Sequence, residues 1–249
     1  MTTGQTTIDV HLLGLHSQAE VNIRSATGGH GRGLGQLLQL DLDILAWEKA
    51  LTGRPETGQL TAARRELGFA IYAASIGLYL HAYAGLRVFL ELSFASVYFS
   101  ANELHRRRWV ADRADFSWSA ALDENDGVMS RPFVQEFSET AAEDAQKFAK
   151  VAARCYRHCS QFIHGKLAAT RLLPETLDFS SVVLADWLRT ASDSASVVLF
   201  LLYARYGDEL LSGPHQDRLA PTVEVWFGHL EEVRRRLGLP IEGREGNAG

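Results

Sequence analysis

The sequence predicts an all-α fold, a helical bundle with a long, hydrophobic central helix. Hydrophobic residues make up 46% and charged residues 22% of the 249-residue chain, which are ordinary values for a globular protein. The six prolines lie almost entirely outside the long apolar stretches, which favours helices over a turn-rich β-sandwich. In those stretches apolar residues recur at helical spacing.

The first 33 residues are rich in threonine and glycine and are expected to form a flexible or weakly structured arm. Within it, residues 8–13 could be a short strand, and a glycine run over residues 28–35 precedes the first predicted helix. The spacing of these glycines matches neither a dinucleotide-binding turn nor a Walker loop. We therefore expect a linker or hinge here, without a bound phosphate.

Residues 34–240 are expected to form one helical domain, because a chain of this length is near the upper limit for a single core. Apolar periodicity, with glycine and proline at the ends, predicts helices over residues 34–51, 57–111, 133–172, 178–206 and 221–237. The second is one long helix or two stacked ones hinged at Gly77 or Gly85, and it is apolar on all sides, as in a buried helix. Residues 112–132 are expected to be a polar connection, and residues 241–249 a disordered tail.

Charge and hydropathy narrow the classes of function. A net charge of −5 argues against a protein that coats nucleic acid through its overall charge and leaves only a localised basic site. Residues 68–86 are apolar enough to suggest a membrane span, but two internal glycines, His81 and the following Arg87 favour a buried core helix. No membrane partner is therefore expected.

The two cysteines, Cys155 and Cys159, are four residues apart and share one helix face. Since the N-terminus offers no signal peptide, we expect reduced thiols in a cytoplasmic protein. An alternative is that the two cysteines and His158 bind a metal ion. However, both cysteines fall on the core-facing stripe of their helix and a fourth ligand is absent nearby, so we expect no metal and no cofactor.

The segment from Arg154 to Gly165 holds the residues best suited to chemistry. On a helical wheel, Phe148 and the two cysteines form the core-facing stripe, whereas Arg157 and His164 lie about 180° and about 160° from Phe148. Both therefore share the face opposite the core, about 10 Å apart along the helix axis.

An arginine followed by a polar residue, a short spacer and a histidine resembles the motif of the HEPN superfamily. Here His158 follows Arg157, and six residues separate Arg157 from His164. The resemblance covers residues 141–171 well and the surrounding helical order only loosely. It implies a helical bundle that forms a homodimer with the motif helices of two copies facing each other. It also implies a metal-independent endoribonuclease of a toxin–antitoxin or antiviral defence system, with Arg157 and His164 as its catalytic residues.

An arginine and a histidine can together cleave RNA without a metal ion. RNA cleavage without metal uses the neighbouring 2′-hydroxyl as nucleophile, so it needs an acid/base group and a cation near the phosphate. A histidine supplies the first and a guanidinium the second, and two copies supply both a proton donor and a proton acceptor. One turn away, Ser160 and Gln161 could hold a phosphate or orient the imidazole, and His158 is a supporting residue.

Arg87 and Glu91 lie four residues apart inside the most hydrophobic stretch. They could form a buried ion pair that fixes the helix register. Alternatively they lie beside the motif helix, where Glu91 would orient Arg157 or His164.

A second basic group, Arg106, Arg107, Arg108 and Trp109, ends the predicted long helix. Cations are favoured at any helix C-terminus, so this group could simply be solvated. The functional alternative is an RNA-contacting patch in which the indole stacks on a base.

Two other classes of function stay open. One is a non-catalytic HEPN-like helical module that assembles with a partner protein, such as an antitoxin. The other is a helical sensor that binds a ligand in a pocket lined by the aromatic residues of the long helix.

Overall fold

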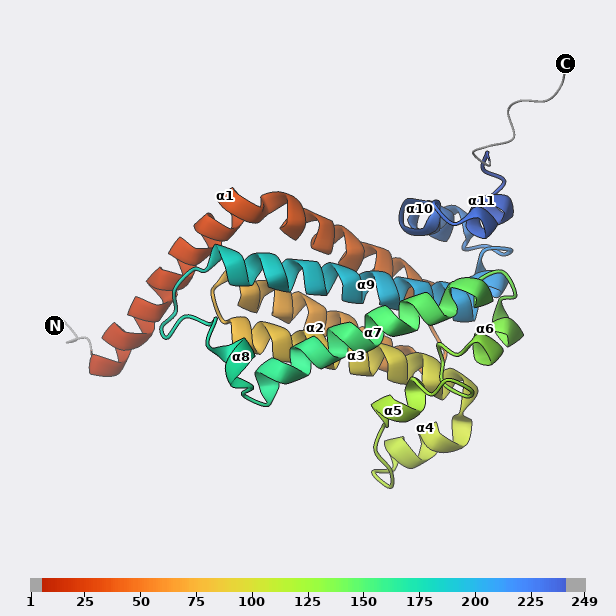
Figure 1. Ribbon diagram of the computed structural model, residues 1–249, viewed down its shortest axis with the longest axis horizontal. Helices are drawn as coiled ribbons and strands as arrows, with labels where there is room; N and C mark the ends of the chain where they lie inside the picture. The colour runs from red at the N-terminus through yellow and green to blue at the C-terminus, as the bar shows by residue number, and fades with distance from the viewer. Residues whose placement is uncertain (1–5, 241–249) are drawn as a thin grey trace, which may run out of the picture.

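The computed structural model describes residues 6–240, and all regular secondary structure in this range is helical (Figure 1). The predicted all-α bundle is confirmed. The helices are α1 (Thr7–Ala50), α2 (Thr57–Ser75), α3 (Tyr79–Ala101), α4 (Glu103–Val110), α5 (Trp118–Ala121), α6 (Arg131–Phe137), α7 (Ala142–Ile163), α8 (Leu167–Thr170), α9 (Ser181–Leu210), α10 (Gln216–Phe227) and α11 (Glu231–Leu237). The predicted tail, residues 241–249, lies outside the described residues.

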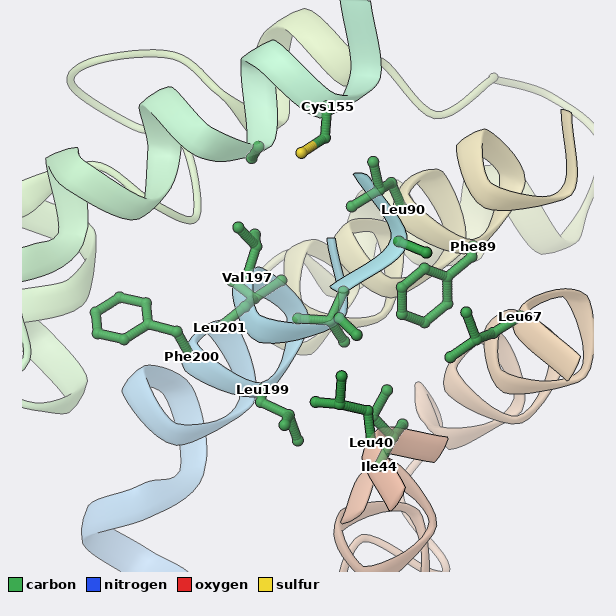
Figure 2. Close-up of a cluster of buried hydrophobic side chains, with 14 of the residues drawn as sticks. Leu40, Ile44, Leu67, Phe89, Leu90, Cys155, Val197, Leu199, Phe200 and Leu201 are labelled. Atoms are coloured by element: carbon green, nitrogen blue, oxygen red, sulfur yellow. The ribbon is translucent and has the colours of Figure 1, made fainter. Parts of the chain in front are cut away.

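The core is enclosed by the five long helices α1, α2, α3, α7 and α9. Helix α9 packs against α1, α3 and α7, and every side chain from Val197 to Tyr203 is fully buried. Figure 2 shows the centre of this core, where Leu40 and Ile44 of α1 lie toward Leu199 of α9, and Leu67 of α2 lies beside Phe89 of α3. The most deeply buried stretch therefore belongs to α9, although the sequence predicts a central helix within residues 57–111.

That predicted long helix is divided at Gly77 and again at Asn102. The predicted hinge at Gly77 is confirmed: its φ of +91° lies in the left-handed region that favours glycine. Gly85 instead lies inside α3, where an added Cβ would approach the Cβ of Ala70 to 3.0 Å. The missing side chain lets α2 and α3 pack closely as an antiparallel pair. No helix within residues 6–240 is long and apolar enough to span a bilayer.

The predicted flexible or weakly structured arm over residues 1–33 is wrong for residues 6–33, and residues 8–13 form no strand. Thr6 and Asp9 cap the start of α1, and the helix continues through the glycine run with a kink at His30. The buried Asn22 side chain donates hydrogen bonds to the carbonyls of Ile76 (2.8 Å) and Leu177 (3.0 Å). These tertiary contacts hold a segment whose glycines disfavour a helix when considered alone.

Two further predicted helices are also divided. The stretch 133–172 contains the end of α6 together with α7 and α8, because α7 ends at Ile163 and Gly165 takes a left-handed φ of +62°. The stretch 221–237 contains the end of α10 and all of α11. The predicted polar connection, 112–132, includes the short helix α5 and the start of α6.

Candidate functional site

Helix α7 separates its two faces as the helical wheel predicts. Cys155, Cys159 and Phe162 are buried, whereas Arg157 and His164 are exposed. His164 is the C-cap residue of α7 and not an interior helical residue. Within residues 6–240 neither the Arg157 nor the His164 side chain makes a hydrogen bond or an ion pair, so both are accessible to a ligand.

After Glu143 and Asp144 in its first turn, α7 and the residues that follow it are locally basic although the chain as a whole is acidic. From residue 145 to residue 171 the sequence has six lysines and arginines and no aspartate or glutamate, in a chain of net charge −5. All six cationic side chains are exposed: Lys147, Lys150, Arg154, Arg157, Lys166 and Arg171. Of these, Arg154 pairs with Asp193 of α9 at 2.9 Å. The result is a local cationic surface that can attract an anionic polymer.

His158 faces α9 and does not contact Arg157 or His164. Its Nε2 lies 2.6 Å from Oδ2 of Asp186, and the Tyr83 hydroxyl of α3 donates to the same oxygen at 2.6 Å. The hydrogen bond from His158, more than any other contact, holds the pKa of the Asp186 carboxyl below its usual value. Arg189 pairs with the other oxygen of Asp186. His158 therefore joins α7, α3 and α9, and a supporting role for it in the Arg157–His164 site stays a prediction.

A cavity of about 260 Å³ adjoins this cluster. Its walls come from α7 and α9: Arg154, Cys155, His158, Arg189, Thr190 and Asp193. The two arginines are each paired with an aspartate of α9, so their charges are locally compensated. The free cations of the α7 surface lie outside this cavity.

One interpretation of the sequence has Glu91 orienting Arg157 or His164. In the structure, neither Arg87 nor Glu91 contacts these two residues through a hydrogen bond or an ion pair. Nε of Arg87 donates to Glu91 at 3.1 Å, and both side chains hydrogen-bond the Tyr156 hydroxyl at 2.8 Å. Trp118 of α5 stacks on the Tyr156 ring at 4.2 Å. The pair is half-buried and joins α3 to α7, so its structural role is close to the predicted register-fixing ion pair.

Ser160 and Gln161, the two polar residues near Arg157, differ in whether their side chains are already hydrogen-bonded. Ser160 donates its hydroxyl proton to the carbonyl oxygen of Tyr156 at 2.8 Å, a bond within its own helix. Gln161 is exposed on the same face as Arg157. Of these two, Gln161 has the freer side chain for contacting a phosphate.

The second basic group forms the separate helix α4 and not the end of a long helix. Arg106 and Arg107 both donate to the carboxylate of Glu103, and the hydrogen bond from Arg106 is the main reason that the pKa of Glu103 falls to about 2. Arg108 is exposed, and the half-buried Trp109 ring lies 5.4 Å from the ring of Phe99. Two of the three guanidinium groups and part of the indole are thus already engaged.

The two thiols lie in the core, as predicted. Both cysteines are free, and burial raises the pKa of Cys155 to about 11 and that of Cys159 further still. Within residues 6–240 no group of three or more histidine, cysteine, aspartate or glutamate side chains has the arrangement of a metal site.

Two residues central to this region were missed from the sequence. Tyr156 connects Arg87 and Glu91, and Asp186 connects His158 and Tyr83. For Asp186 a signal was present, because it is a carboxylate between the buried Leu184 and Trp187 in an apolar stretch of α9. Such a group requires a hydrogen-bonding partner.

No family model matches the chain, and no curated protein or solved structure is significantly similar to it. Membership of the HEPN superfamily consequently rests on the spacing of Arg157 and His164 and stays a prediction.

Proposed function

We propose that this protein is a metal-independent endoribonuclease that acts as a homodimer in the cytoplasm, with Arg157 and His164 as catalytic residues. One observation carries the proposal. The Arg157 and His164 side chains are exposed and have no partner within residues 6–240, on a face of α7 that is basic while the chain as a whole is acidic. The resemblance of their spacing to the HEPN motif supports a defence or toxin–antitoxin role.

The proposed reaction is an internal transesterification. The 2′-oxygen of a ribose attacks the adjacent phosphorus, the bond from phosphorus to the 5′-oxygen breaks, and the products are a 2′,3′-cyclic phosphate and a 5′-hydroxyl. One imidazole accepts the proton of the 2′-hydroxyl and another donates a proton to the leaving 5′-oxygen. The planar guanidinium of Arg157 binds the phosphate oxygens as negative charge develops there.

Two copies are proposed because one copy offers too few free imidazoles on this face. His164 is exposed, but His158 is held by Asp186 and faces α9. A twofold arrangement of α7 helices supplies His164 from each copy, one as base and one as acid. It also doubles the local positive charge available to the RNA backbone.

Incubating the purified full-length protein with a set of structured and unstructured RNAs in EDTA tests the proposal. Wild type should cleave and leave 5′-hydroxyl ends, and a 2′-deoxy substitution at the cleaved nucleotide should block the reaction. His164→Ala should be inactive. His229→Ala is the matched control because His229 is also an exposed histidine, in the connection between α10 and α11.

Cleavage by His164→Ala at the wild-type rate would assign the activity to a contaminant or to another residue. Intact RNA in every reaction would favour the second candidate function, a non-catalytic module that binds a partner protein. The specific observation behind that candidate is the uncovered apolar surface at the start of α1, where Ile8, Leu12 and Leu15 are all exposed.

A further inference from the structure

The first part of α1 projects from the bundle. Figure 1 shows it leaving the left end of the molecule, past the N-terminal end of α9 and the connection between α2 and α3. Residues 6–17 are exposed throughout, and the helix first becomes buried at Ala19. We call residues 6–18 the α1 arm. The arm is a regular helix, with the capping box of Thr6 and Asp9 at its start.

One stripe of side chains runs along the arm and continues into the bundle. Its members are spaced three or four residues apart and lie within about 40° of Ile8 on a helical wheel. Exposure falls steadily along this stripe: Ile8 70%, Leu12 59%, Leu15 41%, Ala19 9%, Asn22 0% and Ala26 0%. The buried end packs on the chain's own bundle. The exposed end is also apolar, but no other part of the described chain packs against it.

A cavity of about 520 Å³ lies at the base of the arm. Leu15 and Ala19 form one side, and the turn between α2 and α3 together with residues 173–177 forms the other. Its rim includes large apolar side chains that are themselves exposed, among them Tyr72, Leu78 and Leu80. Arm and cavity thus present two adjoining apolar surfaces at one end of the molecule.

The charges of the arm indicate what kind of occupant fits. The arm contains no lysine or arginine and carries one carboxylate, Asp9. Amphipathic helices that lie on membranes are rich in basic residues, and RNA binding requires them as well. A protein surface therefore fits the arm better than a membrane or a nucleic acid.

The area of the arm favours a second copy of this chain. A helix of this length is about 20 Å long and about 10 Å across, so seating half its circumference in a groove removes roughly 600 Å² counted on both sides. A single such contact is small for a specific interface, whereas two related by twofold symmetry reach about 1,200 Å², the lower end of the range for stable complexes. Since each copy has both an arm and a cavity, a reciprocal exchange satisfies both surfaces.

We propose that two copies of this protein associate by reciprocal insertion of the α1 arm, through Ile8, Leu12 and Leu15, into the cavity beside Leu78 and Leu80 of the partner copy. This contact does not depend on the proposed nuclease activity. It also lies at the end of the bundle where α7 ends at Ile163 (Figure 1).

Light scattering on the full-length protein at micromolar concentration tests the contact. Wild type should have twice the chain mass of 27.6 kDa. Leu12→Asp should be a monomer at the same concentration, because seating a carboxylate in an apolar groove weakens dimerisation by about 100-fold or more. Val10→Asp is the matched control, since Val10 is equally exposed on the opposite face of the arm and its substitution should leave the dimer intact.

A mixing experiment distinguishes arm-in-groove exchange from simple arm-to-arm pairing. Leu80→Asp should also give a monomer with an unchanged circular dichroism spectrum. Mixing Leu12→Asp with Leu80→Asp should restore a weak heterodimer, because the intact arm of one variant meets the intact cavity of the other. A monomeric wild type, equal loss of dimer in Val10→Asp, or no heterodimer on mixing would each overturn the proposal.

Discussion

The two faces of α7 differ in almost every physical respect. The inner face consists of small and aromatic side chains in full contact with α3 and α9, including Phe162, which stacks on Tyr83 with ring centroids 3.8 Å apart. The outer face carries four exposed cations, and an exposed histidine lies at the end of the helix. The difference teaches that substitutions on one helix should separate stability from activity. An inner change should lower the stability of the fold, whereas an outer change should leave it unaffected.

The largest effect is expected on the inner face. Phe162→Ala should lower the free energy of unfolding by about 3–5 kcal/mol, because it removes a buried ring and leaves a cavity. Urea denaturation measures this loss. Ile163→Ala is the matched control, since the neighbouring Ile163 is exposed and its truncation should cost less than about 1 kcal/mol. Equal losses for the two variants would mean that α7 does not divide into these faces.

The next effect concerns activity on the outer face. If Arg157 binds the phosphate in the transition state, Arg157→Lys should slow RNA cleavage by an amount equivalent to about 2.7–4 kcal/mol, since lysine lacks the planar fork. Arg106→Lys should change cleavage little, because Arg106 already pairs with Glu103 and either cation can do so. Single-turnover rates measure both. A wild-type rate for Arg157→Lys would remove Arg157 from the proposed site.

A smaller effect is expected at the seam between α7 and α9. The pKa of Asp186 is depressed in the folded protein, mainly by His158, so its ionised form contributes stability above the usual carboxyl pKa of about 3.9. That contribution is lost as the pH falls through the lower, folded value. Wild type should therefore be more stable than Asp186→Asn by about 1 kcal/mol near neutral pH, allowing for solvent screening at this half-exposed site.

Urea titrations of the two proteins from pH 7 to about pH 2 measure this difference, which should shrink once the pH falls below the usual carboxyl pKa. A difference that grows on acidification would contradict the assignment of His158 and Tyr83 as partners of an ionised Asp186.

The smallest effect is expected on the free energy of unfolding when His164 is substituted. His164→Ala should alter the free energy of unfolding by less than about 0.5 kcal/mol, because the side chain is exposed and makes no hydrogen bond within residues 6–240. The same variant should abolish cleavage, so the comparison of the two assays is the test. A large drop in the midpoint of thermal unfolding would show that His164 is a structural residue.

Local sequence determined much of α7. The period of its apolar residues alone separates Cys155 and Cys159, which are buried, from Arg157, which is exposed. Helical class was equally predictable, because the apolar residues repeat at helical spacing and the prolines lie outside these stretches. The buried face of α7 and the helical class of the fold both depend on residues that are close together in the chain. The spacing of residues in the sequence is therefore enough to predict them.

Tertiary structure alone decided that the glycine-rich part of α1, residues 28–35, is helical, and which partners the polar side chains meet. The glycines of this stretch disfavour a helix when they are considered alone. Helix α1 is held in place by tertiary contacts such as that of Asn22 with Ile76, 54 residues away in the sequence. The bonds of His158 to Asp186 and of Arg87 to Tyr156 likewise join helices distant in sequence. Periodicity determines which face a side chain occupies, but the neighbour it meets depends on how the helices pack, and that is set by the whole core at once.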